Sequence, residues 1–427
     1  MTVTTAVRTQ LLVALIVLIY SAAVPAQTEI DRLMPAPRDI IPEVSDGIYL
    51  KIETVGKLLD DENFDRALVE MRQLEKRSLN KYERAAVWQM IGYVNGVLGN
   101  TGLAIEHFEK ALAAQALPQF AHQGVLYSLA SLYSGEGEFQ RAIDLLQLWF
   151  QYEDEPAADA HMLMGSWYVA LSQYDDALPF IRKAIMLSER PIESWYALEV
   201  NIHFSQGNYA EAVPILKSML SYWPRRPRYW NMLADAYLQL DNEKATLDVM
   251  MTAYNNSQVT DTQRIMALVG LNMAHDTPFT AGSILENEMI AGVLPDDLVN
   301  LKTLLQIWLS AREYGHAIAT IEKIFAIEND GSWLLRAAKI QVKTGEWRRA
   351  GESAERAIDA GVDNPVSALL LQGMALTELG EFVEALVIFR KVAATGDEEE
   401  QQVAAAWIRY AEEEINYQQK FAAVSGR

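Results

Sequence analysis

The sequence predicts an all-α chain made of about ten helix–turn–helix units, and two observations carry this prediction. From about Ile48 onward, apolar residues recur with the period of an α-helix, and no stretch shows the alternation of a half-buried strand. A small residue also returns every 33 to 38 residues, at Ala67, Ala104, Ala142, Ala177, Ala212, Thr246, Ala281, Ala317, Ala350 and Ala385. A period of this length is typical of stacked helical repeats.

The repeating unit is clearest in residues 85–118, where two amphipathic segments flank a tight turn. Its characteristic residues take positions 4, 8, 20, 24, 27 and 34 of the unit: Trp88, Gly92, Ala104, Phe108, Ala111 and Pro118. Small residues at positions 8 and 20 allow two helices to approach closely. An aromatic residue at position 17 opens the second helix of seven units: Phe64, Phe139, Tyr174, Tyr209, Tyr314, Trp347 and Phe382. Because one helical pair cannot bury its own apolar face, the units are expected to stack into a solenoid, a right-handed superhelix.

The N-terminus has the pattern of a secretory signal peptide in residues 1–26. Arg8 precedes an unbroken apolar run at residues 11–20, and small residues precede the expected cleavage site near Ala26. An N-terminal membrane anchor is the alternative, but spanning a bilayer needs about 20 apolar residues. We therefore expect the protein to be exported to the periplasm with the signal peptide removed.

Six segments follow from these patterns along the chain. They are the signal peptide (1–26), a flexible leader with three prolines (27–43), N-terminal repeats (44–261), a degenerate repeat or joint (262–297), C-terminal repeats (298–396) and a capping helix (397–420). The degenerate repeat lacks the usual aromatic residues, and Thr246 replaces alanine in the unit before it, so we expect a bend or loose joint there. The final helix carries Glu and Gln on its outer face, as the exposed end of a solenoid requires.

Composition and net charge limit which classes of binding partner and site are expected. The chain has no cysteine, which excludes disulfides, thiolate metal sites and cysteine nucleophiles. Its formal net charge of −21 repels phosphate backbones and anionic headgroups, so neither nucleic acid nor lipid is expected to bind. A basic protein segment is the favoured partner, and any membrane association is expected to be peripheral, through protein partners.

The sequence offers no credible active site. The six histidines lie far apart and lack metal-ligand spacing, and neither a phosphate-binding glycine loop nor a nucleophile elbow occurs. We therefore expect no enzymatic activity, no bound metal and no cofactor.

The first helices of the units are expected to line a groove through their positions 2, 5, 9 and 12. In the third to sixth units, the candidate partner-binding residues at these positions are Tyr127, Ser131, Asn201, Phe204, Arg228, Asn231 and Asp235. Asparagine and aromatic side chains in such a groove can hold an extended peptide by its backbone amides. Each residue can equally be a solvated or a packing position, and this alternative stays open.

Four stretches carry a resemblance to a known family: residues 79–85 (LNKYERA), 126–133 (LYSLASLY), 174–185 (YDDALPFIRKAI) and 229–233 (YWNML). Together with the repeat spacing, they resemble the tetratricopeptide repeat (TPR) proteins associated with the TonB energy-transduction system in the periplasm of Gram-negative bacteria. The resemblance implies a non-catalytic accessory of a TonB–ExbB–ExbD motor that drives iron-siderophore uptake. A periplasmic TonB segment is typically basic and proline-rich, so its contact with an acidic scaffold should weaken with salt.

Two other function classes stay open beside the TonB system and its motor proteins. One is an exported TPR scaffold for envelope polysaccharide export or outer-membrane protein assembly, which the neighbouring genes would distinguish. The other is an enzyme, which would need a cluster of ionisable residues facing one pocket. The repeat pattern does not supply such a cluster.

Overall fold

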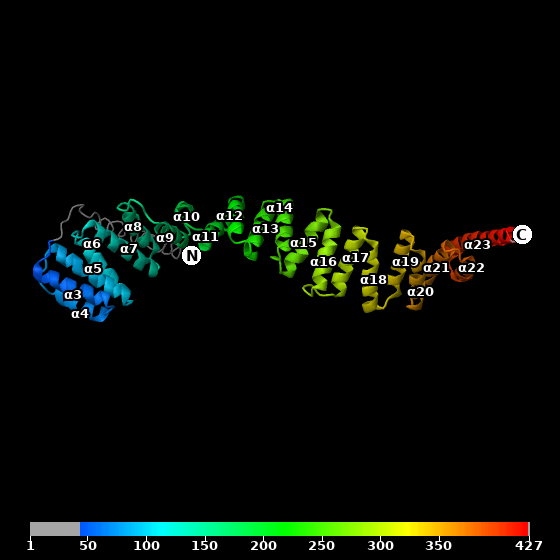
Figure 1. The fold of residues 1–427 in the computed structure, drawn as a ribbon, viewed down its shortest axis with the longest axis horizontal. Helices are drawn as coiled ribbons and strands as arrows, with labels where there is room; N and C mark the ends of the chain where they lie inside the picture. Colours follow the sequence, from blue (N-terminus) through cyan, green and yellow to red (C-terminus); the bar gives the residue numbers. More distant parts are fainter. Residues whose placement is uncertain (1–42, 426–427) are drawn as a thin grey trace, which may run out of the picture. The chain divides into compact units, whose positions relative to one another are not determined.

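The computed structural model describes residues 43–425, and the regular structure of this part is entirely helical. Ten consecutive helical hairpins are followed by one long helix (Figure 1). The hairpins of the N-terminal half are α3 (Asp46–Asp60) with α4 (Phe64–Glu75), α5 (Lys81–Val97) with α6 (Thr101–Ala113), α7 (Gln119–Gly135) with α8 (Phe139–Phe150), α9 (Ala158–Ala170) with α10 (Tyr174–Leu187), and α11 (Glu193–Ser205) with α12 (Tyr209–Tyr222).

The C-terminal half continues the same order. Its hairpins are α13 (Pro227–Gln239) with α14 (Glu243–Asn255), α15 (Thr262–Ala274) with α16 (Pro278–Ile290), α17 (Leu298–Ser310) with α18 (Tyr314–Glu328), α19 (Gly331–Thr344) with α20 (Trp347–Asp359), and α21 (Pro365–Glu378) with α22 (Phe382–Thr395). The last helix is α23 (Glu398–Ser425). The predicted all-α class of ten TPR-like units with a C-terminal helix is confirmed.

The second helix of each hairpin begins where the sequence predicts. In seven hairpins its first residue is the aromatic at position 17, and the position-20 residue of every hairpin is at most 2% exposed. Thr246 fits this place because its hydroxyl donates a hydrogen bond to the carbonyl oxygen of Asn242, one turn back, at 3.1 Å. Its one polar atom is therefore satisfied inside the helix.

One turn geometry closes all ten hairpins. The residue five places before position 20 has a positive φ in each: Glu62, Gly99, Gly137, Ser172, Gly207, Asp241, Asp276, Arg312, Gly345 and Gly380. The following N–H donates to the carbonyl five residues back, as from Asn100 to Asn95 at 2.8 Å and from Thr277 to Asn272 at 2.9 Å. This is the Schellman ending of a helix. Half of these turns have no glycine at the residue with positive φ, so the positions of glycines in the sequence do not identify them.

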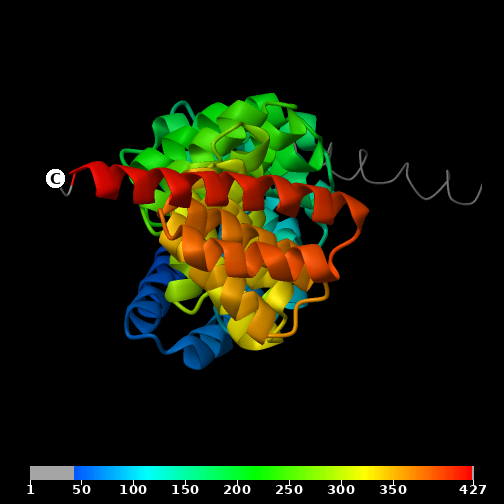
Figure 2. The same cartoon turned by 90° about the vertical axis from the view of Figure 1, so that its right-hand side faces the viewer.

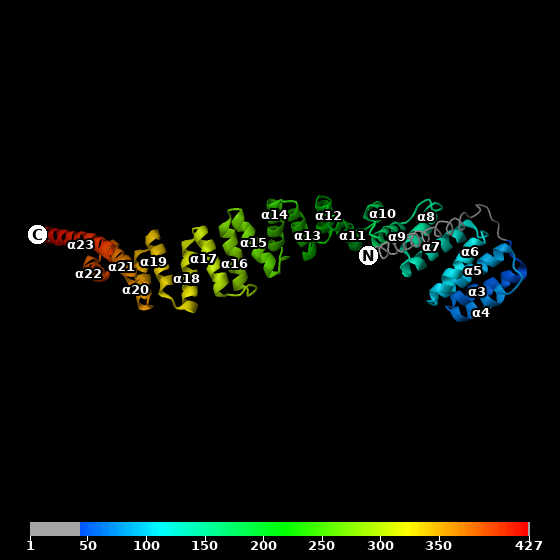
Figure 3. The same ribbon diagram turned by 180° about the vertical axis from the view of Figure 1, so that it is seen from behind.

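The described part of the chain divides into two compact units, unit 1 up to residue 215 and unit 2 from residue 216. Within each unit, successive hairpins lie side by side in chain order (Figure 3). One apolar cluster of unit 1 runs from Ala85 to Trp167, and the largest cluster of unit 2 runs from Ala234 to Ile340. Neighbouring hairpins therefore share their cores, as stacked repeats must.

The segment expected to be degenerate, residues 262–297, forms a regular hairpin of α15 and α16. Its turn residue Asp276 has a φ of 55°, and Pro278 takes the first position of α16, where its missing N–H costs nothing. Leu268 and Leu285 are fully buried in the shared core of unit 2. Whether this hairpin bends the stack stays a prediction.

The final helix begins at Glu398, next to the predicted boundary, but ends at Ser425 rather than at residue 420. Asp397 accepts a hydrogen bond from the N–H of Glu400 at 2.9 Å, and the Glu400 carboxylate accepts one from the N–H of Asp397 at 2.9 Å. This reciprocal pair is a capping box. Beyond residue 420 the helix continues because neither glycine nor proline occurs before Gly426.

The signal peptide expected in residues 1–26, and the leader up to residue 42, lie outside the described residues. Among the helices of the described part, none is long and apolar enough to cross a bilayer.

Candidate functional site

Three adjoining hollows lie over the first helices of unit 1, and together we call them the unit 1 groove. Their volumes are about 370, 430 and 580 Å³. Neighbouring hollows share lining residues, among them Tyr93, Tyr127 and Ser128. The lining comes from α3, α5, α7, the connection between α8 and α9 and the start of α9, together with Phe108 of α6 and Trp149 of α8.

Helical period explains which side chains line the unit 1 groove. Positions 2, 5, 9 and 12 are separated by three or four residues, so they share one face of a helix. In the second and third hairpins the lining residues at these positions are Ala86, Gln89, Tyr93, Gly96, Gly124, Tyr127 and Ser131. In these two hairpins the lining therefore includes the four positions from which a groove was predicted, and their role in partner binding stays a prediction.

Aromatic rings form much of the unit 1 groove. Tyr93 is 52% exposed and Phe120 is 87% exposed, although both are large side chains that usually bury more of their surface. The ring centroid of Tyr127 lies 5.4 Å from that of Trp149, at a tilt of 59°. Burial, with a smaller contribution from Asp159, raises the pKa of Tyr127, so its hydroxyl keeps its proton and can donate.

Several other polar groups of the unit 1 groove present acceptor oxygens. Ser128 donates to the carbonyl oxygen of Gly124 at 2.8 Å, and Ser131 donates to that of Tyr127 at 3.0 Å. Their protons are thus used within α7, while the oxygens still accept. Glu153 and Asp159 add carboxylates, and none of the described residues that line the groove is a lysine or an arginine. The groove therefore favours a molecule rich in donors and positive charge.

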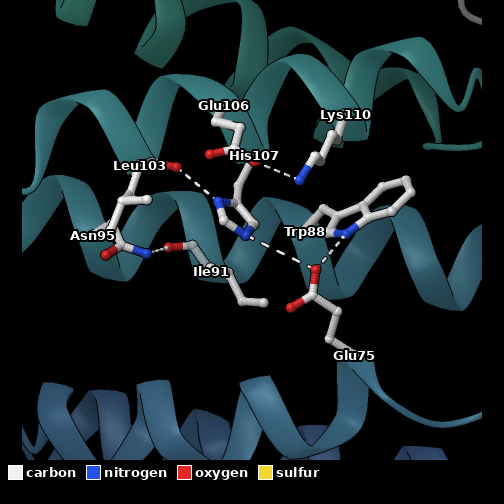
Figure 4. A network of polar contacts seen from close by, with 8 residues as sticks. All are labelled: Glu75, Trp88, Ile91, Asn95, Leu103, Glu106, His107 and Lys110. Atoms are coloured by element: carbon white, nitrogen blue, oxygen red, sulfur yellow. Dashed lines mark hydrogen bonds and ion pairs between the residues drawn. The ribbon is translucent and has the colours of Figure 1, made fainter.

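Polar contacts hold α5, which carries Tyr93, against its neighbours (Figure 4). The indole Nε1 of Trp88 donates to Oε1 of Glu75 on α4 at 2.9 Å. From α6, Nδ1 of His107 donates to the carbonyl oxygen of Leu103 at 2.7 Å, and its Nε2 lies 3.9 Å from the same Glu75 oxygen. One carboxylate thus meets side chains from both helices of the next hairpin.

Of the predicted binding residues, Tyr127 and Ser131 line the unit 1 groove. Sequence reasoning missed Tyr93, Phe120 and Trp149. Tyr93 holds position 9 of the second unit, so the same register would have found it had that unit been included. Phe120 and Trp149 lie outside the four positions, and no signal in the sequence marks them.

The other predicted residues lie elsewhere. Asn201 is exposed and Phe204 half-buried on α11 in unit 1, whereas Arg228, Asn231 and Asp235 lie on α13 in unit 2. The set is thus divided between the two units. Its role in partner binding stays a prediction.

Asp235 is engaged by an arginine that sequence reasoning missed. The Arg264 guanidinium donates Nη1 to Oδ1 and Nη2 to Oδ2 of Asp235, both at 2.8 Å. This bidentate hydrogen bond is the main reason that the pKa of Arg264 is raised. Both residues line a hollow of about 430 Å³ in unit 2. Within the described residues, no group of three His, Cys, Asp or Glu is placed to hold a metal ion.

Ten hairpins with one turn geometry, a small buried residue at position 20 and a lined groove define a helical-repeat scaffold. Family models described as tetratricopeptide repeat match residues 85–116, 198–245 and 335–400. These three segments thus match tetratricopeptide repeats, and TPR repeats generally bind protein partners. No curated protein sequence matches the chain.

Several solved structures, two of them described as TPR proteins, are similar to parts of the chain at low identity. A TPR protein from Parabacteroides merdae is 17% identical, over 62% of this chain and 100% of that one, with a TM-score of 0.37. YrrB, described as a TPR protein with an unusual peptide-binding site, is 17% identical over 47% of this chain and 94% of its own, with a TM-score of 0.36. MamA is 20% identical over 40% and 94%, with a TM-score of 0.31.

Proposed function

We propose that this chain is a non-catalytic periplasmic TPR scaffold whose unit 1 groove binds a basic, proline-rich protein segment. Its role would be that of an accessory to the TonB–ExbB–ExbD system in outer-membrane transport of iron-siderophores. The observation that carries the proposal is the lining of the groove: exposed aromatic rings beside acceptor oxygens and carboxylates, with no basic side chain among its described lining residues.

Such a lining suits a basic, proline-rich segment for two physical reasons. Aromatic-lined grooves bind extended proline-rich segments, because proline rings pack against the aromatic faces and the segment loses little entropy. Glu153 and Asp159 can pair with lysine or arginine of the same segment. The net charge of −21 adds a long-range attraction that speeds encounter and weakens with salt.

The cellular location is inferred from the signal-peptide pattern of residues 1–26. The TonB system enters through the resemblance of four sequence stretches to TPR proteins associated with that system. The repeat fold, and a sequence without a recognisable catalytic motif, support the non-catalytic role.

The proposal is tested by titrating residues 27–427, which contain every described helix, with the purified periplasmic portion of the cognate TonB. We expect binding at low salt that weakens as salt is raised. Tyr93→Ala and Tyr127→Ala should each weaken binding about tenfold, as loss of an aromatic anchor does. Tyr49→Ala is the matched control, because Tyr49 is 59% exposed but lies outside the groove.

A second pair of variants tests the charges. Glu153→Gln with Asp159→Asn should weaken binding and flatten its salt dependence. No association at low salt would refute the TonB partner, whereas association that the tyrosine variants leave unchanged would refute the groove. If a pull-down with the same chain recovers polysaccharide-export or outer-membrane assembly proteins instead, the scaffold belongs to those systems.

A further inference from the structure

The C-terminal helix α23 carries an exposed apolar stripe that the groove proposal does not use. Val403 is 41% exposed, Tyr410 46%, Tyr417 65% and Phe421 64%. These residues are spaced by seven, seven and four, so they lie on one face of the helix. Charged residues surround them along α23, which makes an apolar stripe of this length a sign of an interaction surface.

The first half of α23 packs into unit 2. Ala404 and Ala411 are fully buried, and the Trp407 ring stacks on Phe389 of α22 at 5.7 Å. After Ala411 the helix runs on past α22 (Figure 2). The fourteen residues from 412 to 425 extend it by about 21 Å at 1.5 Å per residue. The second half of the stripe therefore projects beyond the core of unit 2.

The stripe follows the heptad pattern of a coiled coil. Val403, Tyr410 and Tyr417 fall at d positions, and Trp407, Glu414 and Phe421 fall at a positions. Glu413 and Lys420 fall at g positions, which flank the seam, and both are exposed. Glu414 is the one polar residue of this seam. A partner helix must therefore place a hydrogen-bond donor opposite its carboxylate.

We propose that the projecting half of α23 pairs with α23 of a second copy of this chain in antiparallel orientation. In the register that sets a positions opposite d positions, Phe421 of the second copy packs against the exposed side of Tyr410, at the start of the projecting half. The other side of the Tyr410 ring meets Phe382 of α22, with ring centroids 6.3 Å apart. Glu414 then faces the hydroxyl of Tyr417 of the second copy, which can donate a hydrogen bond to the carboxylate. Two-fold symmetry repeats each of these pairs.

The charged residues of α23 favour pairing with a second copy of the same helix, and they favour the antiparallel over the parallel orientation. In this register Glu413 meets Lys420 of the second copy, and symmetry makes the same opposite-charge pair twice. A parallel pair would instead place two Glu414 carboxylates against each other in the seam, where like charges are unfavourable. The interface would join two chains at their C-terminal ends and leave the unit 1 groove of each chain to its own partner.

The proposal is tested by measuring the mass of residues 27–427 by light scattering during gel filtration. At concentrations on the order of 100 µM, which saturate an interface of micromolar affinity, we expect twice the mass of one chain. Tyr417→Glu with Phe421→Glu should give the mass of one chain. Ile290→Glu with Val299→Glu is the matched control, because these side chains are 75% and 72% exposed on α16 and α17. Circular dichroism checks that helix content is unchanged.

Charge reversal tests the orientation. Glu413→Lys and Lys420→Glu should each weaken the pair about tenfold, and the double variant should restore it. A single-chain mass for the unmodified protein, or a double mass that survives Tyr417→Glu with Phe421→Glu, would overturn the proposal. Failure of the double charge reversal to restore a pair that both single variants weaken would overturn the antiparallel arrangement. None of these outcomes depends on TonB binding.

Discussion

Gly92 on α5 and Phe108 on α6 share one volume, because a Cβ added to Gly92 would lie 2.7 Å from Cδ1 of Phe108. The last hairpin repeats this relationship between Gly373 and Phe389, at 2.6 Å. These residues hold positions 8 and 24 of the repeat. A large ring at position 24 thus requires a residue without a side chain at position 8.

Gly92→Ala is expected to destabilise unit 1 by about 1–3 kcal/mol, the usual cost of overpacking. Gly96→Ala is the control in the same helix, since a Cβ there would lie 3.9 Å from Cβ of Ala104, an ordinary contact. Replacing this helical glycine should stabilise the protein by up to about 1 kcal/mol. Urea unfolding followed by circular dichroism measures both changes, and equal effects of the two substitutions would contradict the shared-volume account.

A compensating change should recover part of the loss caused by Gly92→Ala. The third hairpin combines Ala130 and Leu146 at the same two positions, and both are fully buried. Gly92→Ala with Phe108→Leu copies that combination. We expect the double variant to be more stable than the sum of its two single variants predicts, as double-mutant cycles show for contacting residues.

The second prediction concerns the residue with positive φ in each hairpin turn. Ser172 has a φ of 59° at the turn between α9 and α10, a conformation that costs a residue with a side chain about 1–2 kcal/mol. Ser172→Gly should therefore raise the free energy of unfolding, by about 0.5–1 kcal/mol after the greater entropy of unfolded glycine is subtracted. Ser166→Gly, the same change inside α9, should lower it by a similar amount. A loss of stability at Ser172 would show that the turn is not strained.

The third prediction concerns the small residue at position 20 of the repeat. Ala142 is fully buried where α8 meets α7, so Ala142→Leu should cost about 1–3 kcal/mol through overpacking. Ala113→Leu is the control, because Ala113 is exposed on α6 and leucine is a good helix former. If thermal unfolding shows the two variants to be equally stable, close helix approach at position 20 is not what selects alanine.

The buried histidines of unit 1 make stability depend on pH. His122 on α7 and His203 on α11 are each 2% exposed, and burial lowers the pKa of both rings. In the unfolded chain these rings titrate near pH 6.5. Below that pH the unfolded chain binds more protons than the folded one, so the free energy of unfolding falls as pH falls through about 6.5. Above it, the full stability is present.

Hydrogen exchange measured at about pH 7.5 and about pH 5.5, corrected for its intrinsic rates, tests this dependence in unit 1. We expect weaker protection of α7 and α11 at the lower pH. His122→Gln removes one titrating ring and should reduce the loss around α7, whereas Gln119→Ala in the same helix should leave it unchanged. Protection of both helices that is independent of pH would contradict the prediction.

The sequence by itself determined the repeat. Ten buried position-20 residues, seven aromatic helix starts and the start of α23 were all predicted, because each depends on residues close together in the chain. Helical period fixes which side chains share a face, and small volumes at positions 8 and 20 fix which helices can touch. It also placed Tyr127 and Ser131 on the face that forms the groove. Local spacing carries all of this information.

The tertiary structure decided what the stacked hairpins bring together. Trp149 meets Tyr127 across two helices, and Arg264 reaches back 29 residues to Asp235. It also decided that α23 continues past α22 with Tyr417 and Phe421 exposed. Such relationships depend on how one hairpin packs against the next, and the angle and offset of that packing are set by the sum of many buried contacts rather than by any periodic pattern.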